Sequence, residues 1–186
     1  MKTNTIQKSL LVGIGIASGT RRRLTLATPF DVVPFLIEAE KFRSNNNLDN
    51  GVILIAENPG MYSSIATSDE VGVAGERLCS SVQQILKRFS LDQWCIIRES
   101  SFSNDAEYLA LTDSLLPIAA NHFPGVRPEV LAYFAGQTAD VEFLRKKFNV
   151  TSKFGWASDN VHGERAFDNF YSLASDELNK KGILAA

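Results

Sequence analysis

The sequence predicts an α/β domain, a Rossmann-like three-layer sandwich around a mostly parallel central sheet. Short apolar runs recur along the chain, and stretches with helical periodicity separate them. The first two runs and the helical stretch between them form a strand–helix–strand unit, which is right-handed and parallel almost without exception. The 186 residues suffice for a sizeable core, so we expect a single Rossmann-like domain over residues 1–186.

The first half of the chain contains three apolar runs and two amphipathic stretches. A strand covered on both faces loses its polar alternation, which is the pattern of each run. Thr28 and Pro29 suit the N-cap and first residue of the first helix. We therefore expect strands over 9–16, 51–56 and 93–98, and helices over 29–42 and 70–89.

The second half is predicted to be mainly helical. Asn104 or Asp105 is the expected cap of a helix that Pro117 kinks or ends. We expect two shorter helices over 129–136 and 140–148, a strand within 149–156, and a last helix over 163–178.

Composition and charge exclude some classes of protein. The net charge of −2 argues against a chain coated with basic residues for general nucleic-acid binding, although it permits a local basic patch. Cys79 and Cys95 match no metal or redox spacing, so we interpret both as buried structural thiols and expect no metal site.

The N-terminal apolar run does not indicate membrane attachment. It is too short to span a bilayer, and Arg21, Arg22 and Arg23 follow where a signal peptide would be cleaved. We therefore expect a cytoplasmic protein without a membrane anchor.

The loop over residues 15–20, Gly-Ile-Ala-Ser-Gly-Thr, is the first candidate site. It follows the first strand, and ligands in open α/β sheets bind at the carboxyl ends of the strands. Its glycines let the backbone approach a ligand, while Ser18 and Thr20 supply hydroxyls. The N-terminus of a following helix would add backbone N–H donors.

Two other interpretations of this region stay open. Gly13, Gly15 and Gly19 form a variant of the dinucleotide fingerprint, with Glu57 as the candidate acceptor for a ribose hydroxyl. Alternatively, the glycines only allow tight packing. The three arginines at 21–23 either contact phosphates or form a solvated run.

Three segments carry a resemblance to a known family. They are the loop at 15–20, the helix start Asp105-Ala106-Glu107-Tyr108, and Tyr133-Phe134-Ala135-Gly136-Gln137. In this order and at this approximate spacing they resemble the motifs of the cyclodipeptide synthases.

The resemblance implies a fold related to the catalytic domain of class I aminoacyl-tRNA synthetases. Members of the family convert two aminoacyl-tRNAs into a cyclic dipeptide, and they need neither ATP nor a metal because the tRNA ester is already activated. The resemblance therefore implies aminoacyl-tRNA as the partner, with no cofactor.

The family motifs also imply roles for individual residues. A loop serine is the nucleophile; here its position holds Ala17, and Ser18 stands next to it. Thr20 replaces a family asparagine. Tyr133 matches the tyrosine that orients and activates, and Gln137 replaces a glutamate that holds the substrate amino group.

These assignments give a candidate site for acyl transfer, with Ser18 as nucleophile and backbone N–H groups near Gly19 and Thr20 for the oxyanion. Tyr133 and Gln137 complete the catalytic set. The expected substrate-binding residues are Gly15, Ala17, Gly19, Thr20, Trp156 and Asp159. The expected tRNA contacts are Arg21, Arg22, Arg23, Lys87 and Arg88.

Each catalytic candidate also has a structural interpretation. Ser18 could cap the next helix, Tyr133 could be a core aromatic with a satisfied hydroxyl, and Gln137 could be a surface residue. Two other functions also stay open. One is a non-catalytic relative that binds tRNA or a nucleotide, and the other is a small nucleotide-dependent Rossmann-type enzyme.

Overall fold

The computed structural model describes residues 7–18, 24–25, 29–57, 66–154 and 161–183. The chain divides into two compact units. The first is Met1–Ser101 with Leu144–Gly155, and the second is Phe102–Phe143 with Trp156–Ala186. A single domain over the whole chain stays a prediction.

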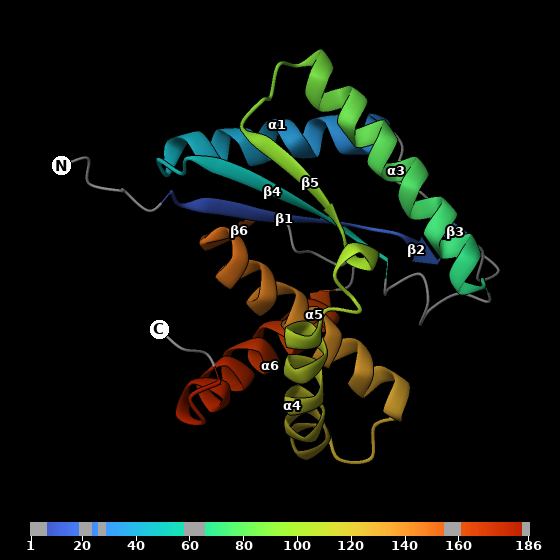
Figure 1. Ribbon diagram of the computed structural model, residues 1–186, viewed down its shortest axis with the longest axis vertical. Helices are drawn as coiled ribbons and strands as arrows, with labels where there is room; N and C mark the ends of the chain where they lie inside the picture. The colour runs from blue at the N-terminus through green and yellow to red at the C-terminus, as the bar shows by residue number, and fades with distance from the viewer. Residues whose placement is uncertain (1–6, 19–23, 26–28, 58–65, 155–160, 184–186) are drawn as a thin grey trace. The chain divides into compact units, whose positions relative to one another are not determined.

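The first unit contains a four-stranded sheet in which every strand is parallel to its neighbours (Figure 1). The spatial order is β5-β4-β1-β6. This arrangement confirms the predicted Rossmann-like α/β fold with a mostly parallel sheet. The strands are β1 (Ser9–Gly15), β4 (Asn50–Ala56), β5 (Trp94–Arg98) and β6 (Val150–Phe154).

The strand order sets where a ligand can bind. From β1 the chain moves outward to β4 and then β5, and it later returns to the other side of β1 as β6. The direction of winding therefore reverses between β1 and β6. In open α/β sheets this reversal creates the ligand-binding crevice, at the carboxyl ends of the strands.

Two helices, α1 (Pro29–Asn45) and α3 (Ser68–Arg88), share one hydrophobic core with alternate residues of the strands. Leu11 and Leu54 point to the opposite face of the sheet and are also fully buried. Burial on both faces explains why the strands show continuous apolar runs. α3 begins with a capping box between Thr67 and Glu70.

Directly after β1 lies a small antiparallel pair of strands that the sequence analysis did not predict. In it β2 (Ala17–Ser18) pairs with β3 (Leu24–Thr25). α1 begins at Pro29, as predicted, so β3 stands between the loop and this helix in the chain. Two-residue strands are too short to show a periodic pattern, so the sequence carries no signal for them.

The second unit is helical. It contains α4 (Ala106–His122), α6 (Val161–Lys180) and most of α5 (Pro128–Phe148), whose end from Leu144 belongs to the first unit. Asp105 caps α4 as predicted, because its side chain accepts a hydrogen bond from the Glu107 N–H. Pro117 lies inside α4 and does not end it.

The prediction of two separate helices over 129–136 and 140–148 is wrong, because α5 is continuous. Between Ala135 and Leu144 nearly every residue is buried, including the polar residues Thr138, Asp140 and Glu142. A continuous helix is recognised in a sequence by its regularly spaced apolar and polar faces, and a helix buried on all sides has no polar face. Buried polar residues then look like the residues of a loop.

No helix in the described part of the chain combines the length and hydropathy needed to cross a bilayer.

Candidate functional site

The candidate loop starts at the carboxyl end of β1, beside the reversal point. Gly15 is the last residue of β1 and is exposed. The next residue, Ile16, is fully buried, and its N–H donates to the Ala56 carbonyl over 3.0 Å. The loop is thus attached at its base to the end of β4.

The backbone of Ser18 lies in β2, where Ser18 pairs with Leu24 and Ala17 pairs with Thr25. Ser18 therefore does not cap a helix, since another strand separates it from α1. One structural interpretation of Ser18 is thereby removed. Several further candidates lie outside the described residues: Gly19, Thr20, Arg21, Arg22, Arg23, Trp156 and Asp159.

Tyr133 and Gln137 are brought together on α5, one helical turn apart. The Gln137 Nε2 donates to the Tyr133 hydroxyl oxygen over 2.7 Å. Both residues are partly buried, so Gln137 is neither fully exposed nor without a side-chain hydrogen bond. A carboxylate at position 137 would only accept hydrogen bonds, whereas the amide donates one here.

Tyr108, in the segment that resembles the family's helix start, has a structural environment. It is 5 % exposed, and its hydroxyl donates to Asp140 Oδ1 over 2.9 Å. Its ring also packs edge-on against Phe102 and Phe143 in the same unit. Tyr108 thus satisfies a buried carboxylate that comes from α5.

Lys87 and Arg88 are exposed in the last turn of α3. α3 leaves the carboxyl end of β4 and returns to the amino end of β5, which runs parallel to β4 (Figure 1). Its last turn therefore lies at the amino edge of the sheet. The structure separates these two residues from Gly15, which lies at the opposite edge.

Glu57, the candidate acceptor for a ribose hydroxyl, is engaged in an internal ion pair. It is 4 % exposed, and its Oε1 accepts from Arg98 Nη2 at 2.5 Å and from Nε at 3.2 Å. Its Oε2 accepts from the Ser100 N–H at 2.8 Å. The carboxylate oxygens are thus occupied by protein donors, which weakens the dinucleotide interpretation.

A second buried carboxylate, Glu99, completes this cluster. Its Oε2 accepts from the Glu57 N–H over 2.6 Å, while Arg98 Nη2 also donates to the Gly72 carbonyl on α3. We call Glu57, Arg98, Glu99 and Ser100 the Glu57 network. This network was not predicted from the sequence, where its signal is limited to an Arg-Glu pair at the end of an apolar run.

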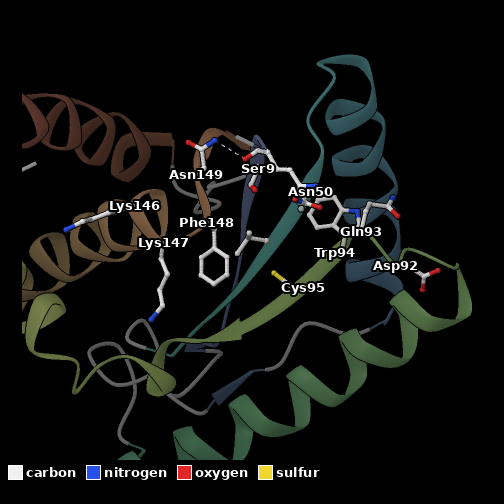
Figure 2. Close-up of a pocket in the computed structure, with 13 residues that line it drawn as sticks. Ser9, Asn50, Asp92, Gln93, Trp94, Cys95, Lys146, Lys147, Phe148 and Asn149 are labelled. Atoms are coloured by element: carbon white, nitrogen blue, oxygen red, sulfur yellow. Dashed lines mark hydrogen bonds between the residues drawn. The ribbon is translucent and has the colours of Figure 1, made fainter. Parts of the chain in front are cut away.

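A groove of about 510 Å³ lies at the amino edge of the sheet (Figure 2). Its walls include polar side chains such as Asn50 and Asp92, the ring of Phe148 and the thiol of Cys95. None of the sequence-predicted site residues lines it. Cys95 is exposed, so its predicted burial is wrong, and Cys79 is only partly buried. Partial burial raises the pKa of the Cys79 thiol.

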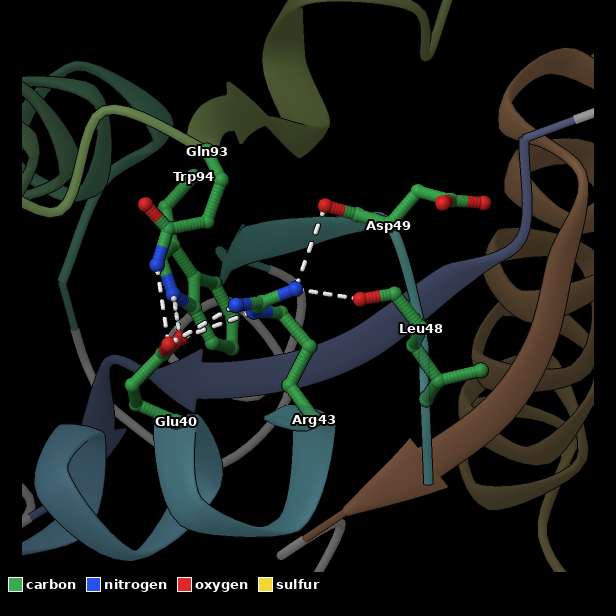
Figure 3. A network of polar contacts seen from close by, with 6 residues as sticks. All are labelled: Glu40, Arg43, Leu48, Asp49, Gln93 and Trp94. Atoms are coloured by element: carbon green, nitrogen blue, oxygen red, sulfur yellow. Dashed lines mark hydrogen bonds and ion pairs between the residues drawn. The ribbon is translucent and has the colours of Figure 1, made fainter. Parts of the chain in front are cut away.

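At the same edge, hydrogen-bond donors surround the carboxylate of Glu40, which lies near the end of α1 (Figure 3). Glu40 accepts from Arg43 Nε and Nη2, both at 2.8 Å, from Trp94 Nε1 at 2.7 Å and from Gln93 Nε2 at 2.9 Å. The bonds from Arg43, above all, lower the pKa of Glu40 to about 2.

Arg43 extends these contacts to the backbone before β4. Its Nη1 donates to the carbonyls of Leu48 and Asp49, the latter over 3.1 Å. We call Glu40, Arg43, Gln93 and Trp94 the Glu40 network. It joins α1 to the starts of β4 and β5 and has a structural role.

Within the described ranges, no group of three or more His, Cys, Asp and Glu residues could hold a metal ion. Comparison of the chain with family models, curated proteins and solved structures finds no match in any of the three.

Proposed function

We propose that the protein is an aminoacyltransferase that uses aminoacyl-tRNAs to form a cyclic dipeptide, with Ser18 accepting the first aminoacyl group. The observation that carries this proposal is the position of Ser18. It follows the carboxyl end of β1, beside the reversal point of the sheet, in the strand β2.

The chemistry needs only the hydroxyl and the activated ester. The Ser18 Oγ attacks the ester carbonyl, a new oxygen–carbon bond forms, and the bond to the tRNA ribose breaks. The departing ribose oxygen takes up the serine proton. The amine of a second aminoacyl-tRNA then attacks the serine ester: a peptide bond forms, the bond to Ser18 Oγ breaks, and Oγ takes up the proton that the amine loses. The free amine of the resulting dipeptidyl-tRNA attacks its own tRNA ester, which closes the ring and releases the second tRNA, whose ribose oxygen takes up that amine's proton. No cofactor or metal enters these steps.

The family resemblance implies that Tyr133 orients and activates and that Gln137 holds the substrate amino group. Their support is the 2.7 Å hydrogen bond that joins the amide and the phenol one turn apart on α5. Loss of the phenol in Tyr133→Phe should slow product formation about tenfold or more, in the range of a positioned polar group. The measurement is the rate of cyclic-dipeptide release.

The deciding experiment combines the purified protein with charged tRNA and detects products by mass spectrometry. Wild type should form a cyclic dipeptide and a covalent aminoacyl-enzyme, and Ser18→Ala should form neither. Ser80→Ala, at an exposed serine on α3, is the matched control and should behave as wild type. Full activity of Ser18→Ala would remove Ser18 as nucleophile.

A second candidate function is tRNA binding without catalysis. The neutral amide at Gln137 favours it, since an amide cannot act as a base. This alternative gives salt-dependent tRNA binding and no product in the same experiment. Either function uses tRNA, which is found where translation takes place, and so implies a cytoplasmic protein.

A further inference from the structure

We propose that Arg98, acting through Glu57, is a positioning residue for the β2–β3 pair that carries Ser18. This inference rests on the proposed function for its catalytic consequence. Its structural part, that Arg98 holds the base of the pair in place, stands on contacts within the first unit alone.

The first step from Ser18 to Arg98 is the connection to β4. Ser18 stands two residues beyond Ile16, which is fully buried and donates its N–H to the Ala56 carbonyl over 3.0 Å. Ala56 also pairs with Gly15 in the ladder between β1 and β4. The position of the β2 strand therefore depends on where the end of β4 lies.

The second step is the connection from β4 to β5. The residue after Ala56 is Glu57, whose N–H donates to Glu99 Oε2 and whose side chain accepts from Ser100 and Arg98. Arg98 Nε and Nη2 both donate to Oε1 while the Ser100 N–H donates to Oε2, so the orientation of the carboxylate is defined. The end of β4 is thereby fixed to the end of β5.

The third step is the connection to α3. Arg98 Nη2 also donates to the Gly72 carbonyl over 2.8 Å. Gly75 lies against the Glu57 carboxylate so closely that a Cβ would stand 2.0 Å from Oε1. One guanidinium thus joins the ends of two strands and the start of a helix, at the edge where ligands bind.

A purely structural role is separated from a positioning role by a matched variant. Arg98→Lys keeps the charge but loses the planar fork. Arg43→Lys makes the same change in the Glu40 network, at the opposite edge of the sheet. If Arg98 only stabilises the fold, both variants should affect function in proportion to their loss of melting temperature.

The first readout is hydrogen exchange of the Ile16 amide and of residues 17–18 and 24–25. Arg98→Lys should speed exchange there about tenfold relative to Arg43→Lys under conditions of equal global stability. Equal exchange in the two variants would overturn the proposal. This readout decides the structural part even if the wild type proves inactive, in which case only the proposed function fails.

The second readout is single-turnover formation of the aminoacyl-enzyme. Arg98→Lys should lower the maximal acylation rate about tenfold or more with an unchanged half-saturating concentration of aminoacyl-tRNA, because a displaced nucleophile affects the chemical step. Arg43→Lys should leave the rate unchanged. If Arg98→Lys does not fold, Glu57→Gln, which keeps the shape of the carboxylate, takes its place. The same changes in hydrogen exchange and acylation rate are then expected, and their absence would overturn the proposal.

Discussion

Two glycines one turn apart on α3 show how closely the Glu57 network is packed. A Cβ at Gly75 would meet the Glu57 carboxylate, whereas a Cβ at Gly72 has no neighbour within 4 Å. The carboxylate cannot easily move aside, because Arg98 and Ser100 hold both of its oxygens. The free space at these two positions therefore differs although both are helical glycines.

Alanine at these positions should have opposite effects on stability. Gly75→Ala should destabilise the protein by about 1–3 kcal/mol, the usual cost of overpacking. Gly72→Ala should stabilise it by about 0.5–1 kcal/mol, because alanine has less freedom to lose on entering a helix. Urea unfolding measures both changes in the free energy of unfolding. If Gly75→Ala stabilised the protein, the side chains of the Glu57 network would be able to shift away from an added Cβ at little cost.

At the scale of elements, the Glu40 network joins the last part of α1 to the starts of β4 and β5. Both oxygens of Glu40 accept hydrogen bonds, and the donors come from α1, β5 and the residue before β5. Each of these bonds favours the charged carboxylate, so the contacts that join α1 to the start of β5 also lower the pKa of Glu40.

This low pKa predicts an acid-sensitive contribution to stability. The pKa of Glu40 is about 2 in the folded protein, below its ordinary value of 4.5, so unfolding favours proton uptake. The contribution is full above about pH 4.5 and is lost as the pH falls toward 2. After allowance for solvent screening at this partly exposed group, we expect a contribution of about 1–2 kcal/mol.

Urea unfolding of wild type and Glu40→Gln between pH 6 and pH 2 measures this contribution. The stability difference between the two proteins should shrink as the pH falls through this window. Glu38→Gln is the control, since the Glu38–Lys41 pair on the same helix is exposed. A difference between wild type and Glu40→Gln that is constant over the range would contradict the expected linkage.

At the scale of the whole molecule, any tRNA binding has to come from local charge, since the net charge is −2. Arg21–Arg23 stand between β2 and β3 in the sequence, whereas Lys87 and Arg88 lie at the amino edge of the sheet. Mutation of one group at a time therefore distinguishes the contributions of the two groups to tRNA binding.

Replacing Arg21–Arg23 by alanine should weaken tRNA binding and reduce the slope of log K against log salt by about two to three, since roughly one phosphate contact is lost per arginine. Replacing Lys87 and Arg88 should have a smaller effect. Filter binding across a salt series measures both slopes. If replacing Lys87 and Arg88 weakened tRNA binding more than replacing the three arginines, the tRNA-binding surface would instead lie at the amino edge of the sheet.

The sequence was most informative about regular elements that are long and locally patterned. The runs that became β1, β4 and β5 were predicted to within a residue or two, because buried parallel strands leave continuous apolar stretches. Asp105 as a cap was also predicted, since capping depends on residues within one turn. The β2–β3 pair and the continuity of α5 were not predicted, because neither produces a local periodic pattern in the sequence.

The sequence by itself determined the α/β class, the parallel sheet and the position of Ser18 after the first strand, because these follow from the order of locally encoded elements. Only the tertiary structure decided that Glu57 pairs with Arg98, 41 residues away, and that Lys87 lies at the opposite edge from Gly15. Such pairings depend on which strand ends meet in the sheet. Which strand ends lie side by side is set when the sheet assembles, and no local sequence pattern encodes it.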